Sequence, residues 1–443
     1  MLRTTVKKLS VCLAAATALA ACSVAAAFTK PAFPRVGGIQ IGGPMNYNDP
    51  NYQASLAKQD VMILGMYPGL APGGQSMNSV VQGIKAKNAN ALVFLYINSD
   101  DVPAASSASS DSYATVRAKV NTMKWWLYSD KALTAAVASS FDGNARALNN
   151  TLYTPRDANG DTAVEWLTKY YVNTYYQPNQ SIDGFFMDNT TVEPMEAGDW
   201  LRNGGVAQIK DAAAGTAVRQ GYVRYYALSK SLMPGKYQIG NLTTWAASGA
   251  AIPPEYQNMT NGGVLEGFVG KSWSVESWGG WAAMMKQYTA IMSAMSEPKL
   301  GIFNQWGDPT DYQSMRYGLG SCMLNDGYWA FTANANQYTG VVWFDELDQK
   351  LGQGQTIPTA AWQKGVWRRD FDNGIVLVNP KGNGTQTLTL ETSYVKFKGT
   401  QDPTTNNGQT LTTITLKDRD GIILLRKNPL KRPAAPQKLS AGT

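Results

Sequence analysis

The sequence predicts an α/β fold, a (β/α)8 TIM barrel with a small C-terminal antiparallel β-domain. Eight apolar segments of strand length alternate with segments of helical spacing over most of the chain. Several of these strand segments end in carboxylates or amides, as expected where parallel strands open onto a barrel mouth. From about residue 362, short β-rich segments separated by Gly and Asn turns replace the alternation.

The length of 443 residues exceeds one typical domain and suits a barrel of about 250–300 residues with additions. We expect four parts along the chain. These are a signal peptide over residues 1–27, a barrel over 28–361, a β-sandwich-like domain over 362–427 and a disordered tail over 428–443.

The first half of the predicted barrel contains four strands and two helices. Helical spacing covers Ser79–Asn88 and Thr162–Tyr176. A long connection, about residues 99–161, follows the third strand, and long βα loops are where barrels build clefts. The predicted strands are Arg35–Ile41, Asp60–Tyr67, Ala91–Asn98 and Ile182–Asp188.

The second half repeats the alternation, with helices predicted over Gly221–Ser231 and Trp281–Met295. Its predicted strands are Lys236–Leu242, Gly263–Phe268, Lys299–Trp306 and Asp326–Phe331. The C-terminal domain is predicted to contain the strands Gly374–Asn379, Thr385–Glu391, Thr410–Leu416 and Ile422–Arg426.

The N-terminus predicts export. Arg3, Lys7 and Lys8 precede an apolar run, Leu9–Ala21, that is too short to cross a bilayer. The sequence around Cys22 (LAAC) resembles a bacterial lipobox, which favours lipidation of Cys22 and an outer-membrane lipoprotein. Ordinary cleavage after Ala27 is the alternative and would give a periplasmic or secreted protein.

Composition excludes several classes of chemistry. The chain has no His, which removes Ser–His–Asp catalysis and the usual His-containing zinc sites. The formal net charge is +7, but eight Lys and Arg residues lie in the two terminal segments. The rest of the chain is about neutral, so no nucleic-acid-binding surface is expected. Nothing in the sequence requires a cofactor or a metal, and the oligomeric state stays open.

Two carboxylates are the leading catalytic candidates. Asp188 ends the apolar segment IDGFFMDN, and Glu266 lies in the strand segment GVLEGF. Acids on two barrel strands are the minimum equipment for cleaving a glycosidic bond. A helix cap or a structural ion pair is the alternative for each. Other acids near strand ends that could replace one of the pair are Asp100, Asp101, Glu193, Glu276, Asp308 and Asp326.

Aromatic side chains suit a carbohydrate substrate because the apolar face of a sugar packs on a ring face, although most tryptophans in proteins are core residues. Arg156 could bind a sugar hydroxyl or a uronate, or could brace its own loop. The predicted substrate-binding residues are Tyr67, Asp100, Trp126, Arg156, Trp245, Trp273 and Trp306, with Tyr328 as a further stacking candidate.

Four segments, IDGFFMDN, YTPRDANGD, DGYWAF and GVWRRDFDNGIVLVNP, resemble the hypothetical glycosyl hydrolase families, bacterial barrel proteins near the α-galactosidase-type superfamily. The resemblance covers about residues 35–426. It implies that Asp188, ending the fourth strand, is the nucleophile and that Glu266, on the sixth, is the acid/base. Asp is commoner than Glu at the second position, so Glu266 departs from the pattern.

These observations together predict an exported glycoside hydrolase acting on a poly- or oligosaccharide. The alternative is a catalytically silent carbohydrate-binding envelope lipoprotein, which would hold one carboxylate among aromatic rings. A lyase that uses Arg156 to bind a uronate is a third possibility. The sugar, the linkage, endo or exo action and the stereochemical course are left open by the sequence.

Overall fold

The computed structural model describes residues 28–42, 47–65, 76–105, 113–247, 249–270, 273–333, 338–428 and 430. The predicted signal peptide, the lipidation candidate Cys22 and the stacking candidate Tyr67 lie outside these residues, as does most of the predicted tail. Within the described residues, no helix is long and apolar enough to cross a membrane.

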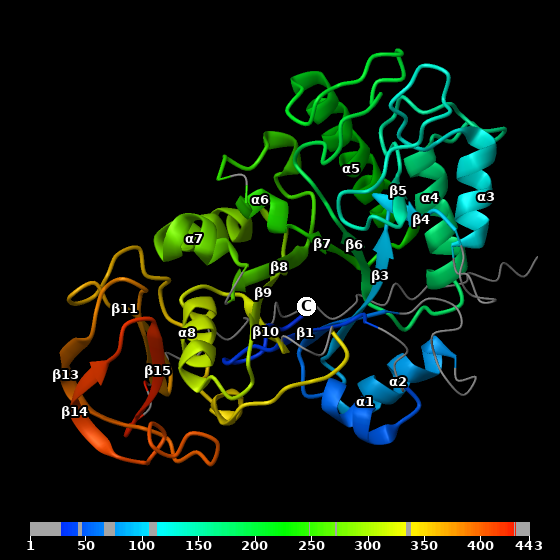
Figure 1. The fold of residues 1–443 in the computed structure, drawn as a ribbon. Coiled ribbons are helices and arrows are strands. Elements are labelled where there is room, and N and C mark those ends of the chain that lie inside the picture. The colour runs from blue at the N-terminus through cyan, green and yellow to red at the C-terminus, as the bar shows by residue number, and fades with distance from the viewer. Residues whose placement is uncertain are drawn as a thin grey trace, which may run out of the picture.

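Eight parallel strands form one sheet that curls into a barrel, which confirms the predicted fold class (Figure 1). Each predicted strand segment overlaps one of them. In sheet order they are β1 (Gly37–Gln40), β2 (Val61–Leu64), β3 (Leu92–Asn98), β6 (Gly184–Asp188), β7 (Tyr237–Asn241), β8 (Gly262–Val269), β9 (Leu300–Gly307) and β10 (Tyr328–Ala333).

The first and last strands of the sheet meet and nearly close the barrel. Val36 forms a parallel bridge with Trp329, whose backbone N–H donates to the carbonyl oxygen of Arg35 at 2.9 Å. Apolar side chains fill the interior, among them Ile39, Ile63 and Phe94. Because both faces of each strand are covered, the strands are nearly continuous apolar runs, and this is why the sequence predicts them well.

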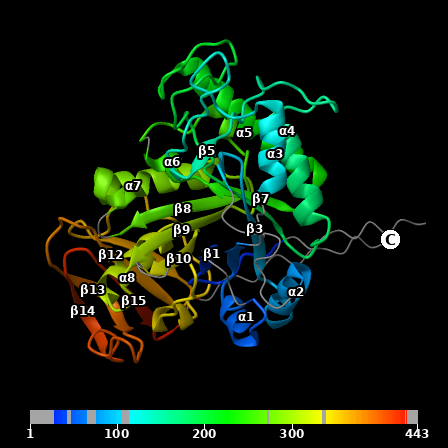
Figure 2. The ribbon, with the colours of Figure 1, turned by 45° about the vertical axis from the view of Figure 1, so that its right-hand side comes forward.

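The helices of the barrel lie mainly outside the sheet, with α3, α4 and α5 grouped beside β3, β6 and β7 (Figures 1 and 2). They are α1 (Pro50–Leu56), α2 (Met77–Lys87), α3 (Ala114–Met123), α4 (Ala163–Tyr171), α5 (Ala212–Leu232), α6 (Thr243–Ala247), α7 (Val275–Ala294) and α8 (Tyr312–Met323). A π-helical turn, Val172–Tyr176, extends α4, and 3-10 turns cover Pro254–Tyr256 and Asp345–Asp348.

Helix α8 was not predicted from the sequence. Its segment YQSMRYGLGSCM holds two glycines, which disfavour a helix in isolation. Packing overrides this preference, because α8 lies between the barrel and the C-terminal sheet (Figure 1). A Cβ atom at Gly320 would approach the side chain of Val378 on that sheet to 2.8 Å, so the missing side chain permits the close contact.

The C-terminal sheet is antiparallel and follows the barrel in the chain, as predicted. Its order is β11 (Trp367–Phe371), β12 (Gly374–Asn379), β15 (Asp420–Arg426), β13 (Gln386–Val395) and β14 (Thr410–Leu416). Strand β11, with the sequence WRRDF, lacks an apolar alternation and was not predicted. A two-stranded ribbon, β4 (Asp101–Pro103) with β5 (Ala145–Ala147), forms within the long loop after β3.

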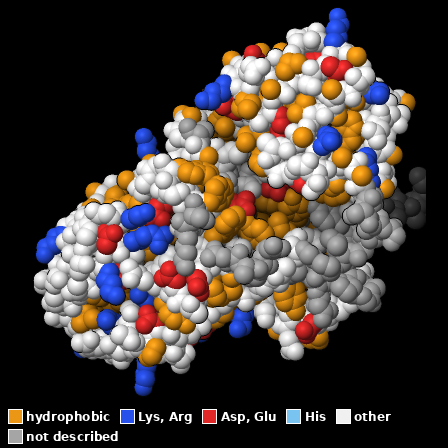
Figure 3. Space-filling view, in the orientation of Figure 1, with side chains coloured by type: hydrophobic (Ala, Val, Ile, Leu, Met, Phe, Trp, Pro, Cys, Tyr) orange, Lys and Arg blue, Asp and Glu red, His pale blue; other side chains and the backbone are white. Residues whose placement is uncertain are grey.

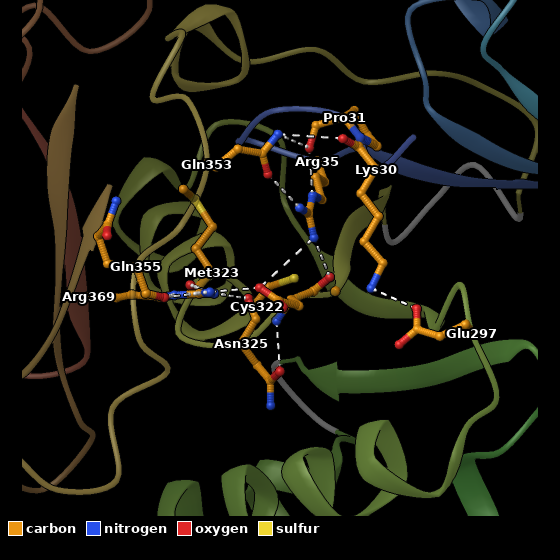
Figure 4. Close-up of polar contacts among 12 residues, drawn as sticks. Lys30, Pro31, Arg35, Glu297, Cys322, Met323, Asn325, Gln353, Gln355 and Arg369 are labelled. Atoms are coloured by element: carbon orange, nitrogen blue, oxygen red, sulfur yellow. Dashed lines mark hydrogen bonds and ion pairs between the residues drawn. The ribbon is translucent and has the colours of Figure 1, made fainter. Parts of the chain in front are cut away.

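Two buried arginines meet at the bottom of the barrel, and one of them, Arg369, joins it to the C-terminal sheet (Figure 4). Arg369 of β11 donates to the carbonyl oxygens of Met323 and Asn325 and pairs with Asp326 at 2.7 Å. Arg35 donates to the carbonyl oxygen of Asp326 at 2.9 Å. Asp326 therefore lies at the amino end of β10, where it contacts both arginines. This is the end of the barrel expected from its position before the strand segment.

Candidate active site

The two predicted catalytic carboxylates lie together at the carboxyl ends of the barrel strands. Asp188 is the last residue of β6, in register with Asn98 of β3, and Glu266 lies in β8. Each keeps a partly exposed side chain, at the floor of an opening. Figure 3 shows a hollow in the middle of the barrel where acidic and hydrophobic side chains meet.

A bulge in β8 directs Glu266 toward the mouth. The pairing of β8 with β9 shifts between Leu265, opposite Phe303, and Val269, opposite Gln305. The extra residues bend the strand, as bulges near active sites commonly do. Gly267 within the bulge has a φ of 56°, and its N–H donates to the Asn304 side chain at 3.1 Å.

Asn241, which ends β7 between the two acid-bearing strands, connects the carboxylates. Its Nδ2 donates to Oδ1 of Asp188 at 3.0 Å and to Oε2 of Glu266 at 3.0 Å. Because both oxygens lie 3.0 Å from the same nitrogen, they are at most about 6 Å apart. Thr243 supports the arrangement, since its hydroxyl accepts from the Glu266 backbone N–H at 2.7 Å.

Two tyrosines donate to the remaining carboxylate oxygens. The Tyr96 hydroxyl, from β3, donates to Oδ2 of Asp188 at 2.6 Å. The Tyr338 hydroxyl, from the segment after β10, donates to Oε1 of Glu266. Asp188 also accepts from the Asn189 backbone N–H at 2.9 Å. Among the described residues, Asp188 thus has three donors and Glu266 has two.

The surroundings raise the pKa of both carboxyl groups. Burial is the main cause of the raised pKa of Asp188, and the bonds from Tyr96, Asn241 and Asn189 oppose it. Burial also raises the pKa of Glu266, and the negative charge of Asp188 raises it further, against the bonds from Tyr338 and Asn241. The charge of Asp188 is thus one cause of the raised pKa of Glu266, whereas the three bonds to Asp188 all act to lower its own pKa.

Two further acids lie near Asp188 at the end of β3. Asp100 is buried beside the Tyr222 hydroxyl, and burial together with Glu196, Asp101 and Asp188 raises its pKa well above the usual value. The side chain of Asp101 accepts from Asn98 at 2.8 Å and from Ser139. Asp100 is 3% exposed, so it lies beneath the mouth instead of presenting its carboxylate to a sugar, contrary to the prediction.

The predicted stacking residues Trp273 and Trp306 lie beside the acids. Their rings stack at 5.1 Å between centroids and 29° between planes, and Trp306 meets the Tyr338 ring edge-on at 6.2 Å. Trp278, which was not predicted, packs edge-on against Trp273 at 5.2 Å. A Cβ atom at Gly267 would come within 2.1 Å of the Trp273 ring, so glycine there permits this ring position.

Three other predicted stacking rings are core residues, which corrects the expectation for them. Trp126 donates its Nε1–H to Asn121 at 2.7 Å, and Trp245 donates to the Thr190 carbonyl at 2.7 Å. Trp126, Trp245 and Tyr328 are buried, so none offers a ring face to a sugar. Sequence periodicity does not separate these rings from exposed ones, because loops decide which side of a ring is covered.

Arg156 braces its own loop, which was the alternative left open for it. Its Nη1 donates to the Gly160 carbonyl at 2.6 Å and to Oε2 of Glu165 at 3.1 Å. Glu165 forms a capping box with Thr162 at the start of α4 and also pairs with Arg224 at 2.8 Å. The Arg156 guanidinium therefore stabilises the start of α4 and makes no direct contact with Asp188 or Glu266.

Among the other candidate acids, Glu276 also has a structural role. It accepts from the Tyr317 hydroxyl at 2.6 Å and pairs with Arg419 at 3.0 Å, which links α7 to the C-terminal sheet. Across the described residues, no group of three or more His, Cys, Asp or Glu side chains is arranged to hold a metal ion.

Three polar neighbours of the carboxylates were not predicted from the sequence. Asn241 could have been proposed from the sequence, because a polar residue near the end of the predicted strand KYQIGNL is expected at the barrel mouth. Tyr96 could not have been proposed in this way, because it lies inside the apolar run ALVFLYIN and resembles a core residue. Tyr338 lies more than 70 residues from Glu266 in the chain, and only the closing of the barrel brings them together.

Comparison with known proteins gives a family match. The model described as "Hypothetical glycosyl hydrolase family 15" matches residues 85–375, which is more than half of the chain. No curated protein matches the sequence.

Solved structures with a similar fold include two alpha-amylases. One is from Geobacillus thermoleovorans, with 10% identity, coverage of 89% of this chain and 98% of that chain, and a TM-score of 0.48. The other is from Malbranchea cinnamomea, with 9% identity, coverage of 88% and 96%, and a TM-score of 0.48. The glycoside hydrolase domain of PelA from Pseudomonas aeruginosa has 11% identity, coverage of 70% and 99%, and a TM-score of 0.41.

Proposed function

The chain belongs to hypothetical glycosyl hydrolase family 15, and from this premise we propose that it is an exported glycoside hydrolase that retains anomeric configuration. Asp188 is the nucleophile and Glu266 the acid/base in this proposal. The substrate is a poly- or oligosaccharide.

The observation that carries the proposal is the shared hydrogen-bond donor. Asp188 and Glu266 each accept from Nδ2 of Asn241 at 3.0 Å, so their facing oxygens are at most about 6 Å apart. Retaining enzymes place their carboxyl groups about 5–5.5 Å apart, whereas inverting enzymes leave about 6.5–9.5 Å for a water molecule. The separation supports retention.

The first step follows from the different environments of the acids. One oxygen of the Asp188 carboxylate, which accepts three hydrogen bonds, attacks the anomeric carbon and forms an ester bond. The bond from that carbon to the glycosidic oxygen breaks, and Glu266 gives its proton to the departing oxygen. When Glu266 is protonated, the Tyr338 hydroxyl can rotate to accept a bond from it, because a phenol can donate or accept.

The second step reverses the roles. Glu266, now ionised, takes a proton from a water molecule whose oxygen attacks the anomeric carbon. The ester bond to Asp188 breaks and returns a carboxylate, so the sugar leaves with its original configuration. The three donors around Asp188 stabilise its negative charge at both ends of the cycle.

Export is supported by the sequence before residue 28, where a basic start precedes an apolar run. We propose that the mature chain begins at a lipidated Cys22 and is anchored in the outer membrane. Mass spectrometry of the mature N-terminus checks this. A diacylglyceryl-modified Cys22 supports the anchor, and an N-terminus at Phe28 supports ordinary cleavage and a periplasmic or secreted product.

The decisive experiment measures hydrolysis of a polysaccharide and aryl-glycoside panel by the mature protein, Asp188→Asn and Glu266→Gln. Both variants should lose about 10³-fold or more in kcat. The anomer released first, followed by NMR, should match the configuration of the substrate. Activity that survives either substitution contradicts the role of that residue. Sugar binding without turnover by the parent protein would instead favour the silent binding lipoprotein.

A further inference from the structure

A continuous path of four aromatic rings leads from Glu266 to the outer surface. It begins at Tyr338, whose hydroxyl donates to Glu266, and passes to Trp306 at 6.2 Å, Trp273 at 5.1 Å and Trp278 at 5.2 Å between ring centroids. Trp273 is 38% and Trp278 is 50% exposed. Large aromatic side chains exposed side by side mark binding surfaces more often than chance exposure.

The outer end of the path borders a cavity of about 240 Å³ between α6 and α7. Trp278, Ala246, Met284 and Gln287 are among its lining residues. Gln287 is more than nine-tenths buried, and its Oε1 has no hydrogen-bond partner in the part of the chain that the structure describes. A buried acceptor without a partner is costly, and a ligand hydroxyl would supply the missing donor.

The backbone presents Trp278 to this surface. Gly280 has a φ of 80°, which separates the first turn of α7 from the rest of the helix. Beyond it, Trp281 is buried and donates its Nε1–H to the Ser321 hydroxyl at 2.9 Å. The kink therefore lets two tryptophans three residues apart serve different roles, one in the core and one at the surface.

We propose that this path binds the leaving-group end of a linear saccharide chain, so that the substrate extends several sugar units beyond the cleaved bond. This inference rests on the proposed function. The acid must touch the glycosidic oxygen, and the path starts at the acid Glu266 instead of at Asp188. The exposed surfaces of Trp273 and Trp278 can pack on a sugar, and the cavity beyond Trp278 can receive a hydroxyl-bearing ring next to Gln287.

The test compares short and long substrates. A methylumbelliferyl monoglycoside that the parent protein cleaves is paired with the linear hexasaccharide of the same sugar. In Trp278→Ala, the ratio of kcat/KM for the hexasaccharide to kcat/KM for the aryl glycoside should fall about tenfold or more, because the aryl group ends at the inner rings. Trp362→Ala is the matched control. It removes a partly exposed tryptophan that packs on Arg368 in the C-terminal sheet, and the ratio should stay at the parental value.

An unchanged ratio in Trp278→Ala overturns the inference even if hydrolysis itself is established. Loss of the proposed function is recognised separately, because it appears as activity that survives Asp188→Asn or Glu266→Gln. If no glycoside is turned over, tryptophan fluorescence titrations with malto-, cello-, xylo- and chitohexaose replace kinetics. Binding by the parent that weakens about tenfold in Trp278→Ala supports the path, and equal binding by both, or none by either, overturns it.

Discussion

Thr243 fixes the direction in which the side-chain amide of Asn241 faces. Its backbone N–H donates to Oδ1 of Asn241 at 3.1 Å and its hydroxyl donates to the same oxygen at 2.7 Å. With the oxygen occupied by two donors, the amide nitrogen must face the opposite way, toward Asp188 and Glu266. The spacing of the two carboxylates is therefore set by a residue that carries no charge.

The first prediction concerns Asn241→Asp. The substitution removes the shared donor and sets a third acid between Asp188 and Glu266. We expect kcat/KM to fall about 100-fold or more and its acidic limb to move to higher pH, because the Asn241 bond lowers the pKa of Asp188. Asn261→Ala is the control, since that amide donates to the Glu297 carbonyl at the amino end of β8. Parental activity with an unmoved acidic limb would refute the positioning role.

The second prediction uses the two tyrosines as a matched pair in pH–rate profiles. Tyr96→Phe removes a donor that lowers the pKa of Asp188, which must be ionised, so the acidic limb should move to higher pH. Tyr338→Phe removes a donor that lowers the pKa of Glu266, which must be protonated, so the basic limb should move to higher pH. Both variants moving the same limb would contradict the assigned roles.

The third prediction concerns Gly267→Ala. Both the positive φ and the approach to the Trp273 ring oppose a methyl group there. Displacing the ring should lower kcat/KM for oligosaccharides about tenfold, with about 1–3 kcal/mol of lost stability. Gly235→Ala is the control, because Gly235 has a φ of 77° and nothing within 4 Å of its added Cβ. It should lose stability without losing activity. Equal activity in the two variants would show that the Trp273 position is unimportant.

The fourth prediction concerns the junction beneath the barrel. Arg369→Met removes the buried guanidinium that binds Asp326 and two carbonyl oxygens, and we expect a loss of about 3–5 kcal/mol in the free energy of unfolding. Arg368→Met removes a neighbour that pairs with Glu391 and Asp370 on the more exposed face, and about 1 kcal/mol or less should be lost. Urea unfolding measures both. Equal losses would mean that Arg369 does not join barrel and sheet.

Much of the fold is determined by local pattern. All eight barrel strands were predicted because parallel strands are buried on both faces and form apolar runs. Helix α8 and strand β11 were missed because contacts between the barrel and the C-terminal sheet stabilise them, and those contacts involve residues far apart in the chain. Gly320 and Arg369, unfavourable locally for a helix and a buried strand, are accommodated by these contacts.

The sequence by itself determined the barrel and the placement of Asp188 and Glu266 on its strands, since alternation and strand-end chemistry are local properties. Only the tertiary structure decided what surrounds them. It brought Asn241 between the acids, added Tyr96 and Tyr338 from distant parts of the chain, and buried Trp126 while exposing Trp278. The physical reason is that a side chain's partners and exposure depend on barrel closure and on which loops cover it, and both arise from contacts between distant residues.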